Sequence, residues 1–298
     1  MTKTIQDMLK EQPSQASSSS NAQSIEYIDT VDAYDKWAEI YDTDGNFLQR
    51  LDTIEMRTLL PQFLNRVNAR FHGTDPFKLV DLGCGTGRNT IQLLEAVSAC
   101  EKNQKTSTQV THRPSVEVIG VDASAGMLEV ARTAIQSATR ELNSTTVSLG
   151  TLNLLQTISD KSQLPESLQD GAVGVISTLV LEHIPLKAFF KAASAIMRPG
   201  AYFLVTNMHA QMGSLSQAGF TDPGTGVKIR PTSYCHSIAD VLAAAAEAGF
   251  QVEPLEEECG GGEVLERTVD EELSGILGVR ATKWIGIQVW FGVCFSKV

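Results

Sequence analysis

The sequence predicts an α/β protein in which helices cover both faces of a mostly parallel sheet. Apolar runs that suit strands alternate with stretches that suit helices, which is the pattern of βαβ units. Residues 172–179 (AVGVISTL) form an apolar run, as is typical of a strand covered on both faces. A glycine-rich turn at residues 83–87 (GCGTG) follows one such run and precedes a helical stretch. Together these observations favour one extended α/β domain.

The expected strands and helices alternate from residue 77 onwards, after two N-terminal helices at residues 31–41 and 48–67. Strands are expected at residues 77–83, 116–122, 147–150, 172–179, 202–206, 250–257 and 284–296. Further helices are expected at residues 88–99, 125–143, 185–197, 240–248 and 266–277. Because the chain ends in a strand–helix–strand meander, we expect the last strand to insert antiparallel into the sheet.

A leader and two insertions interrupt this pattern. Residues 1–25 include a stretch rich in Ser, Gln and Asn that has almost nothing to bury, so we predict a disordered leader. The domain then spans residues 26–298, with N-terminal lid helices at 26–70 and a surface insertion at 101–115. The segment 207–237 is long and contains Gly, Pro and Met, and we expect it to form a substrate lid.

The composition excludes several classes of function. The 298 residues include 24 Lys and Arg against 35 Asp and Glu, a net charge of −11, whereas binding to a nucleic-acid backbone needs clustered cations. Five scattered cysteines form no CxxC pair, so we predict neither a disulfide framework nor a bound metal. We find no secretion signal and no apolar run of bilayer length, and we therefore expect a cytoplasmic monomer without membrane partners. The charge favours a small, uncharged or apolar substrate.

The glycine turn and an acidic strand end together predict a nucleoside site. Gly83, Gly85 and Gly87 let a ligand approach the backbone, and the N–H groups of the next helix face that ligand. Their GxGxG spacing differs from the GxGxxG of dinucleotide binders, and no P-loop lysine follows. Asp122 ends the second expected strand, where a carboxylate can accept both ribose hydroxyls. Taken alone, Asp122 is equally well explained as a turn residue.

Four segments resemble successive motifs of class I S-adenosylmethionine-dependent methyltransferases. They are LVDLGCGTGRNT (79–90), VIGVDASAGMLEVAR (118–132), VISTLVLEHIP (175–185) and MRPGAYFLV (197–205). The resemblance implies a Rossmann-like, mostly parallel sheet of seven strands whose last strand is antiparallel. It also implies that the cofactor is S-adenosyl-L-methionine and that the product is S-adenosyl-L-homocysteine.

The resemblance carries the family's cofactor-binding positions over to this chain. The implied residues are Tyr34, Trp37, Asp81, Gly83, Cys84, Gly85, Asp122, Ala123, Met127, Asn153, Leu154, Thr178 and Leu179. Asp81 and Gly83 would lie beside the methionine part, Asp122 would bind the ribose, and Ala123 and Met127 would flank the adenine. Thr178 and Leu179 would face the methyl-bearing sulfonium. The loop that contains Asn153 departs from the common family pattern.

The stretch AYDKWAEIYD (33–42) resembles the N-terminal lid helix of the same family. Tyr34 and Trp37 would then close over the cofactor carboxylate and sulfonium, since an aromatic face attracts a cation by about 0.5–2 kcal/mol. The alternative is that Tyr34, Trp37 and Tyr41 only pack a helix.

His183 is the best candidate for a general base, because it follows the fourth strand, where reaction centres lie. The alternative is that His183 and Glu182 only stabilise the loop. His209 and His236, which flank the expected lid, are weaker candidates. Four lid residues are expected either to wall an apolar substrate cavity or to pack in the ordinary way: Met208, His209, Met212 and Phe220.

Segments at the two ends of the chain, at residues 34–49 and 266–295, resemble fungal small-molecule methyltransferases. Among these the chain is most similar to S-methyltransferases that cap the two thiols of reduced, gliotoxin-type dithiols. That resemblance implies conversion of a dithiol to a bis-thioether, a detoxifying or down-regulating step in secondary metabolism. Two alternatives remain open: methylation of oxygen or nitrogen in another fungal metabolite, and a regulator that binds the cofactor without catalysis.

Overall fold

The computed structural model describes residues 4–7, 24–104, 115–139, 145–156, 161–255 and 263–298. The Ser-rich stretch of the predicted leader and most of the predicted insertion at 101–115 lie outside these residues. Within the described part of the chain, no helix is long and apolar enough to cross a membrane.

Five parallel strands form the centre of the main sheet, which is covered on both faces. They are β2 (Phe77–Leu82), β3 (Val116–Asp122), β4 (Thr145–Thr151), β5 (Ala172–Thr178) and β6 (Met197–Met208). Their spatial order is β4-β3-β2-β5-β6, and every neighbouring pair is parallel. The order therefore reverses between β2 and β5, the place where open α/β sheets bind their ligands beyond the carboxyl ends of the strands.

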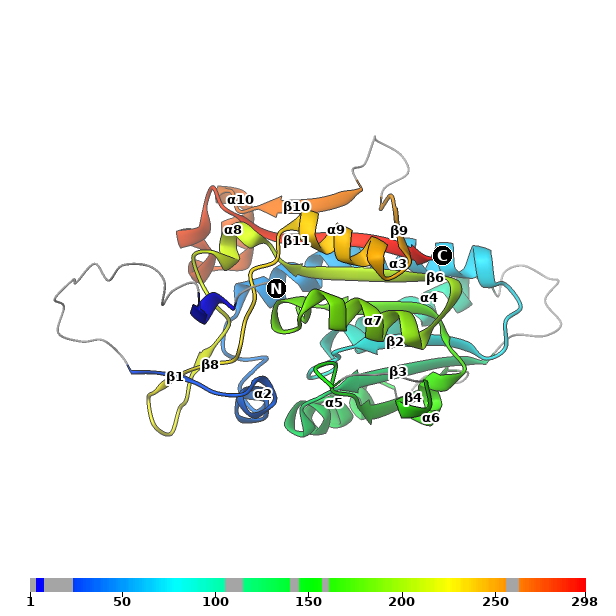
Figure 1. The fold of residues 1–298 in the computed structure, drawn as a ribbon, viewed down its shortest axis with the longest axis horizontal. Helices are drawn as coiled ribbons and strands as arrows, with labels where there is room; N and C mark the ends of the chain where they lie inside the picture. The colour runs from blue at the N-terminus through cyan, green and yellow to red at the C-terminus, as the bar shows by residue number, and fades with distance from the viewer. Residues whose placement is uncertain (1–3, 8–23, 105–114, 140–144, 157–160, 256–262) are drawn as a thin grey trace.

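Antiparallel strands complete the sheet beside β6. The last strand, β11 (Gln288–Lys297), runs antiparallel to β6, which confirms the expected ending (Figure 1). It also pairs antiparallel with β9 (Phe250–Glu253) and with β10 (Val264–Thr268). The sheet thus has eight strands among the described residues, and not the expected seven.

The extra strand is β10, because residues 266–268 belong to it and not to the helix predicted over 266–277. The helix there, α10 (Glu271–Leu277), begins only after Asp270, whose side chain accepts the Leu273 N–H. A 3-10 segment, η3 (Val279–Trp284), then delays the start of β11 to Gln288.

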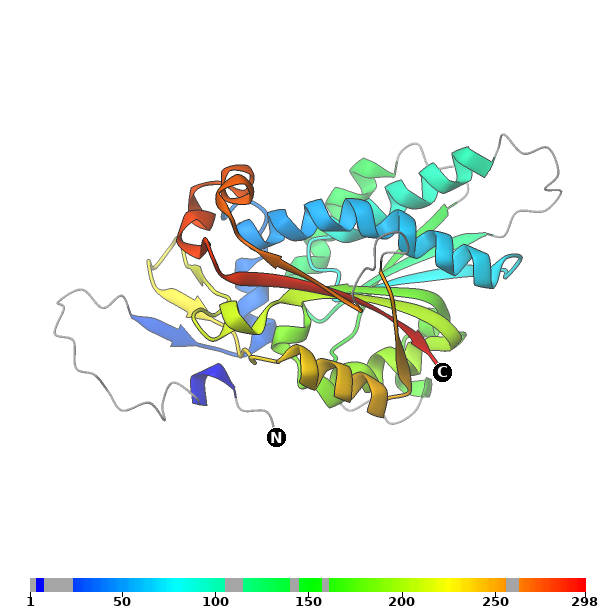
Figure 2. The same ribbon diagram turned by 90° about the horizontal axis from the view of Figure 1, so that it is seen from above.

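Helices cover the sheet on two sides, and Figure 2 shows both layers. One apolar core lies under α3 (Phe47–Phe71), α4 (Arg88–Gln104) and α5 (Ala125–Ala138). The second lies under α6 (Glu166–Gln169), α7 (Leu186–Ile196) and α9 (Ile238–Glu247), with η1 (Lys161–Gln163) nearby in the chain. All but α6 and η1 correspond to predicted helices, with ends that differ by a few residues.

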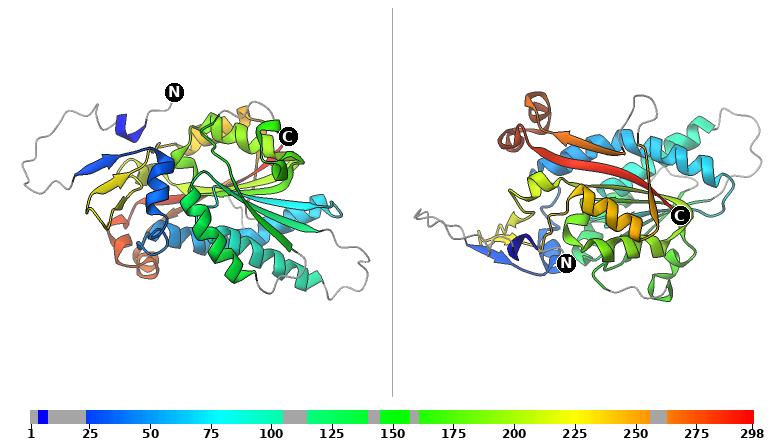
Figure 3. Two further views of the ribbon diagram at one scale, coloured as in Figure 1. Left: turned by 90° about the horizontal axis from the view of Figure 1, so that it is seen from below. Right: turned by 45° about the horizontal axis from the view of Figure 1, so that its top comes forward.

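A small second sheet lies beside α2 (Thr30–Trp37), beyond the main sheet (Figure 3). It has the order β1-β8-β7, with strands β1 (Ile25–Tyr27), β8 (Lys228–Arg230) and β7 (Phe220–Thr221). The expected lid at 207–237 thus has structure of its own: the end of β6, helix α8 (Ala210–Gly213), β7 and β8.

Residues 4–7, at the start of the predicted leader, contact a distant part of the chain. The Ile5 N–H donates to the Ser233 carbonyl at 2.9 Å, Thr4 pairs with Tyr234, and the Ile5 side chain is buried. Residues 4–7 therefore lie against the end of the expected lid segment.

A fully buried carboxylate, Asp52 on α3, joins three parts of the fold. It accepts hydrogen bonds from Arg88 and Asn89 at 2.9 Å each, from Thr206 at 2.5 Å and from Trp290 at 3.0 Å. Asp52 therefore fixes α3 to the start of α4, to β6 and to β11. The sequence did not single it out, because its donors are far away along the chain.

We expect Asp52→Ala to lower the free energy of unfolding by about 3–5 kcal/mol, because it leaves the Arg88 cation without its carboxylate. Urea unfolding measures the loss. Asp170→Ala is the control, since Asp170 pairs with Lys78 but its side chain is 74% exposed, and it should cost less than about 1 kcal/mol. Equal losses for the two variants would contradict the role of Asp52.

Candidate functional site

A cavity opens where the strand order reverses, beyond the carboxyl ends of β2, β3 and β5. We call it the glycine-loop cavity, and it holds about 650 Å³ of empty space, its open mouth included. This size suits a small-molecule ligand. Nine of the predicted cofactor residues line it: Tyr34, Gly83, Gly85, Asp122, Ala123, Asn153, Leu154, Thr178 and Leu179. His183 lines it as well.

The glycine loop is folded back onto the end of β3. The N–H groups of Gly83 and Cys84 donate to the Val121 carbonyl at 2.8 and 3.0 Å, and Gly85 N–H donates to the Asp122 carboxylate at 2.9 Å. Gly83 has a φ of 79°, and a Cβ there would lie 2.3 Å from a methyl of Val180. Only glycine fits this position, which explains the first glycine of the motif.

Asp122 lines the cavity with a carboxylate that the local backbone already orients. Its second oxygen accepts the Ser124 N–H at 2.9 Å. Burial raises the pKa of Asp122, while hydrogen bonds from Ser124, Gly85 and Ala123 oppose that rise. Each oxygen keeps a free acceptor direction. The carboxylate is therefore suited to accept hydrogen bonds from two neighbouring hydroxyls of a ligand.

The end of β5 brings a strained residue to the cavity wall. Leu179 has a φ of 57°, a left-handed conformation that costs a non-glycine residue about 1–2 kcal/mol. Its N–H donates to the Thr206 carbonyl at 2.9 Å, and Thr178 before it accepts from Asn89 at 2.6 Å. Strain of this kind is typical of functional sites.

Tyr34 and His183 form a bridge across the cavity. The Tyr34 hydroxyl lies 2.7 Å from His183 Nε2, and His183 Nδ1 lies 2.9 Å from the Thr232 carbonyl. A carbonyl can only accept, so Nδ1 carries a proton, and in the neutral imidazole Nε2 then accepts the Tyr34 hydroxyl. Burial raises the pKa of Tyr34 well above its usual value, which keeps this hydroxyl protonated. In this arrangement His183 positions Tyr34.

A second carboxylate fixes α2 to the start of α5. Asp35 accepts the Ser124 hydroxyl at 2.5 Å and the Gly126 N–H at 2.9 Å, at the start of α5. Acceptors at a helix N-terminus satisfy N–H groups that have no partner within the helix. Asp35 lies in the lid-helix motif of the sequence, but only the contact itself identifies its role.

Four residues predicted to bind the cofactor do not line the glycine-loop cavity. Asp81 and Cys84 are buried beneath the loop, and Met127 is fully buried among side chains that include Ala33 and Ile229. Trp37 faces a different cavity, described below. Each motif residue was assigned from its place in the motif, whereas the side-chain direction depends on packing.

Asp81 makes stability depend on pH. One oxygen accepts the Thr90 hydroxyl at 2.6 Å, the other has no partner, and burial raises the pKa to about 7. The unfolded value is ~3.9, so the folded state binds the proton more tightly. Protonation of Asp81 therefore contributes to the free energy of unfolding. This contribution is fully present below pH ~4, is lost as the pH rises towards 7, and changes no further above 7.

Asn cannot ionise, so Asp81→Asn should not lose this stability as the pH rises. Between pH ~4 and 7 its free energy of unfolding should therefore rise relative to that of the wild type by up to ~1.4 kcal/mol per pH unit. Urea unfolding of both proteins without cofactor, from pH 5 to 9, measures the difference. Asp170→Asn, at an exposed position, should show a difference that hardly changes with pH. A constant difference for Asp81→Asn would contradict the raised pKa.

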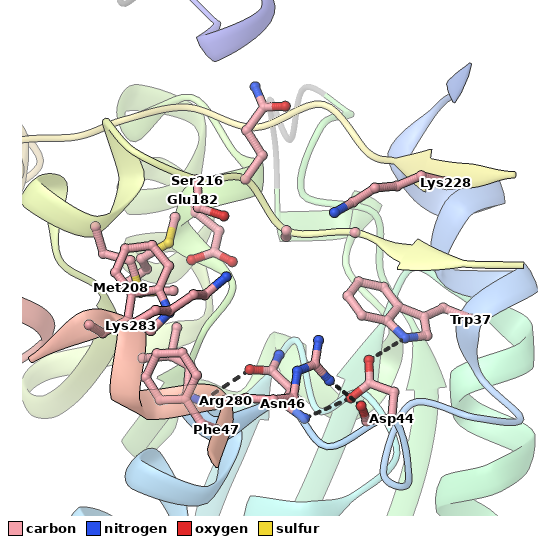
Figure 4. A pocket seen from close by; sticks show the side chains of 16 residues that line it. Trp37, Asp44, Asn46, Phe47, Glu182, Met208, Ser216, Lys228, Arg280 and Lys283 are labelled. Atoms are coloured by element: carbon pink, nitrogen blue, oxygen red, sulfur yellow. Dashed lines mark hydrogen bonds between the residues drawn. The ribbon is translucent and has the colours of Figure 1, made fainter. Parts of the chain in front are cut away.

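The second cavity lies beside the first and holds about 710 Å³ of empty space, again with its open mouth (Figure 4). Apolar walls come from Trp37, Phe47, Met208, Met212 and Trp284. Met208 and Met212, two of the predicted lid residues, line this cavity and are also buried in the apolar core, so both interpretations of them stay open. Two other predicted residues do not line it. Phe220 stacks on Trp37 at 5.1 Å, and His209 accepts from Gln211 at the start of α8 while its Nε2 lies 3.0 Å from Glu266.

Glu182, on η2 (Leu181–His183), lines the second cavity, while the next residue, His183, lines the glycine-loop cavity. Its side chain is only 7% exposed and lines the second cavity. One carboxylate oxygen lies 3.4 Å from His183 Nε2, and the other has no hydrogen-bond partner. The sequence treated Glu182 as a loop residue, because its direction towards the second cavity cannot be read from a motif.

The fold and the site together define a class I, S-adenosylmethionine-dependent methyltransferase. Residues 74–222 match the model of a family described as a methyltransferase domain. An uncharacterized methyltransferase of Emericella nidulans is 48% identical over 301 residues, which cover 97% of this chain and 98% of that protein. The chain therefore belongs to the methyltransferase family.

Solved structures share the fold at low sequence identity. Magnesium protoporphyrin IX methyltransferase from Synechocystis PCC 6803 has a TM-score of 0.51 and 14% identity, over 89% of this chain and 94% of that one. Geranyl diphosphate C-methyltransferase from Streptomyces coelicolor has a TM-score of 0.50 and 15% identity, over 84% and 80%. Both were solved with bound S-adenosyl-L-homocysteine.

The cofactor of the protein is S-adenosylmethionine, and the glycine-loop cavity fits it. The backbone at Gly83 and Gly85 is open to a ligand, Asp122 presents a carboxylate, and Leu154 adds an apolar wall. A nucleoside needs both features, a hydrogen-bond acceptor for its sugar and apolar surface for its base.

Proposed function

We propose that this methyltransferase methylates free thiols of a small secondary metabolite, converting a gliotoxin-type dithiol to a bis-thioether. The observation that carries the proposal is the second cavity, which combines the side chains of Met208, Met212 and Trp284 with the buried carboxylate of Glu182, one oxygen of which has no hydrogen-bond partner among the described residues. Methionine and tryptophan side chains offer a polarizable surface, which suits a sulfur-containing acceptor. The resemblance of both chain ends to S-methyltransferases supports the same acceptor.

We propose the following roles for the cofactor cavity. Asp122 binds the ribose, while Ala123, Asn153 and Leu154 surround the adenine. Gly83 and Gly85 lie along the methionine part, and Thr178 and Leu179 face the transferred group. Tyr34, held by His183, covers the cofactor.

Bound S-adenosylmethionine supplies a methyl group on a sulfonium, a good electrophile with a neutral leaving group. The protein then has to hold the acceptor sulfur in line and remove its proton. Glu182 is placed for the second task, because its side chain lines the acceptor cavity and one of its carboxylate oxygens has no hydrogen-bond partner in the described part of the chain. The S–H proton moves to Glu182 as the new S–CH₃ bond forms. A thiol, with a pKa of ~8.5, needs only modest help from such a base.

The test offers the purified protein with S-adenosylmethionine a panel of dithiols, phenols and amines, with reduced gliotoxin among the dithiols. Mass spectrometry should detect one or two added methyl groups on the dithiols. Methylation restricted to phenols or amines would overturn the thiol assignment in favour of O- or N-methylation. Tight cofactor binding without any methylated product would instead indicate a regulator.

A further inference from the structure

We propose that the second cavity binds a methyl acceptor that carries an anionic group, a carboxylate being the simplest, and that Lys228 and Lys283 bind this group. The inference rests on the proposed function only in treating the ligand of this cavity as the methyl acceptor. It differs from the expectation drawn from net charge, which favoured an uncharged acceptor. It also narrows the proposed function, because it calls for a thiol acceptor with an anionic group, which reduced gliotoxin itself lacks.

Three cations from two distant segments line the second cavity: Lys228 on β8, and Arg280 and Lys283 on η3. Figure 4 shows the amines of Lys228 and Lys283 directed into the cavity from opposite walls. Lys228 is half-buried, and its pKa is lowered by burial and by the nearby charges of Arg230, Lys283 and Arg280. Cations that repel one another at one cavity are stabilised when an anion binds between them.

Neither lysine is neutralised within the described part of the chain. No carboxylate there forms an ion pair with Lys228 or Lys283. Lys283 lies over the Trp284 ring, 5.2 Å from its centre, and this contact leaves its charge in place. The net charge of −11 repels anions at long range. A local cluster of cations without ion-pair partners is therefore the place where an anion can bind.

Asp44, one of the two carboxylates of the same cavity, does not cancel this cluster. The oxygens of Asp44 accept from Trp37 Nε1 and from the Asn46 N–H at 2.9 Å each, and Arg280 donates to the Asp44 carbonyl. Arg280 and Asp44 therefore compensate each other, since the Arg280 charge opposes the rise in the pKa of Asp44 that burial causes.

Glu182 and the two lysines offer a ligand different kinds of hydrogen-bonding group. The buried, unpartnered oxygen of Glu182 calls for a hydrogen-bond donor, which the S–H of an acceptor supplies, whereas the lysines call for an acceptor group. A ligand that carries both a protic nucleophile and an anionic group satisfies both kinds of partner. A ligand with only apolar groups leaves the Glu182 oxygen and both amines without partners.

The experiment measures binding of two matched thioethers to the protein saturated with S-adenosyl-L-homocysteine: 4-(methylthio)benzoate and 4-(methylthio)benzyl alcohol. They share the ring and the thioether, and at the end remote from sulfur one carries a carboxylate and the other a neutral hydroxymethyl group. By isothermal titration calorimetry we expect the benzoate to bind about tenfold more tightly, the worth of one hydrogen bond to a charged group. Lys228→Gln and Lys283→Gln should each reduce the ratio, and the double variant should abolish it.

Lys187→Gln is the matched control, because Lys187 is exposed on α7 and lines neither of the two cavities. It should keep the wild-type ratio, and none of these variants should change the affinity for S-adenosyl-L-homocysteine. Equal binding of the two thioethers to the wild type, or a preference that survives in the double variant, would overturn the inference. This binding measurement needs no methyl transfer, so a failed thiol assay would not affect its result. If the protein methylates thiols but binds the two thioethers equally, only the anion-binding inference is refuted.

Discussion

Asp122→Ala is expected to weaken binding of S-adenosyl-L-homocysteine about 100-fold or more, because it removes the carboxylate that we assign to the two ribose hydroxyls. Hydrogen bonds to a charged group contribute about 1.5–3 kcal/mol each, so the loss of two gives an effect of this size. Isothermal titration calorimetry measures the affinity directly.

The same carboxylate also holds the Gly85 and Ser124 N–H groups, so a weaker loop could mimic the result. The control is Ser124→Ala, which removes the hydroxyl that caps α5 and bonds to Asp35 but leaves Asp122 in place. It should weaken binding much less, and thermal unfolding without ligand should show both variants folded. An affinity of Asp122→Ala within threefold of the wild type would refute the ribose assignment.

Glu182→Gln is expected to lower kcat for a thiol acceptor about 30-fold at pH 7, because without the base only the ~3% of a thiol of pKa ~8.5 that is already thiolate can react. Glutamine keeps the size of the side chain but cannot take the proton. The loss should shrink as the pH rises through the thiol pKa of ~8.5, because above it the acceptor arrives as the thiolate. Steady-state rates from pH 6 to 10 measure the effect.

His183→Gln is the comparison that separates the two residues. Since His183 Nε2 is engaged by the Tyr34 hydroxyl, its loss should raise KM for the cofactor and leave the shape of the pH profile unchanged. If His183→Gln showed the pH-dependent loss and Glu182→Gln did not, the proton acceptor would be His183, as the sequence suggested. A loss in Glu182→Gln that is equal at all pH values would indicate a role in positioning only.

The cofactor cavity could be predicted because its parts are local in sequence. Gly83, Gly85 and Asp122 each lie where a strand ends, and parallel strands bring their carboxyl ends to one edge of the sheet. The pattern did not show which way side chains point. Met127 and Trp37 belong to the same motifs, yet Met127 is buried in the core and Trp37 faces the second cavity.

The strands beside β6 were predicted less well for a related reason. Residues 264–268 alternate too briefly to tell a strand from a helix, and β10 is defined by its pairing with β11. That pairing depends on two segments that meet only in the folded chain.

The sequence by itself therefore determined the fold class, the antiparallel ending and the cofactor, because each depends on short contiguous patterns. Only the tertiary structure shows the second cavity, which we propose as the acceptor site. Trp37, Glu182, Lys228 and Lys283 come from four distant segments and meet around one cavity, and no local pattern records that they share it. The overall charge of −11 is likewise a sum over the whole chain, whereas a ligand responds to the few cations that the fold places around it.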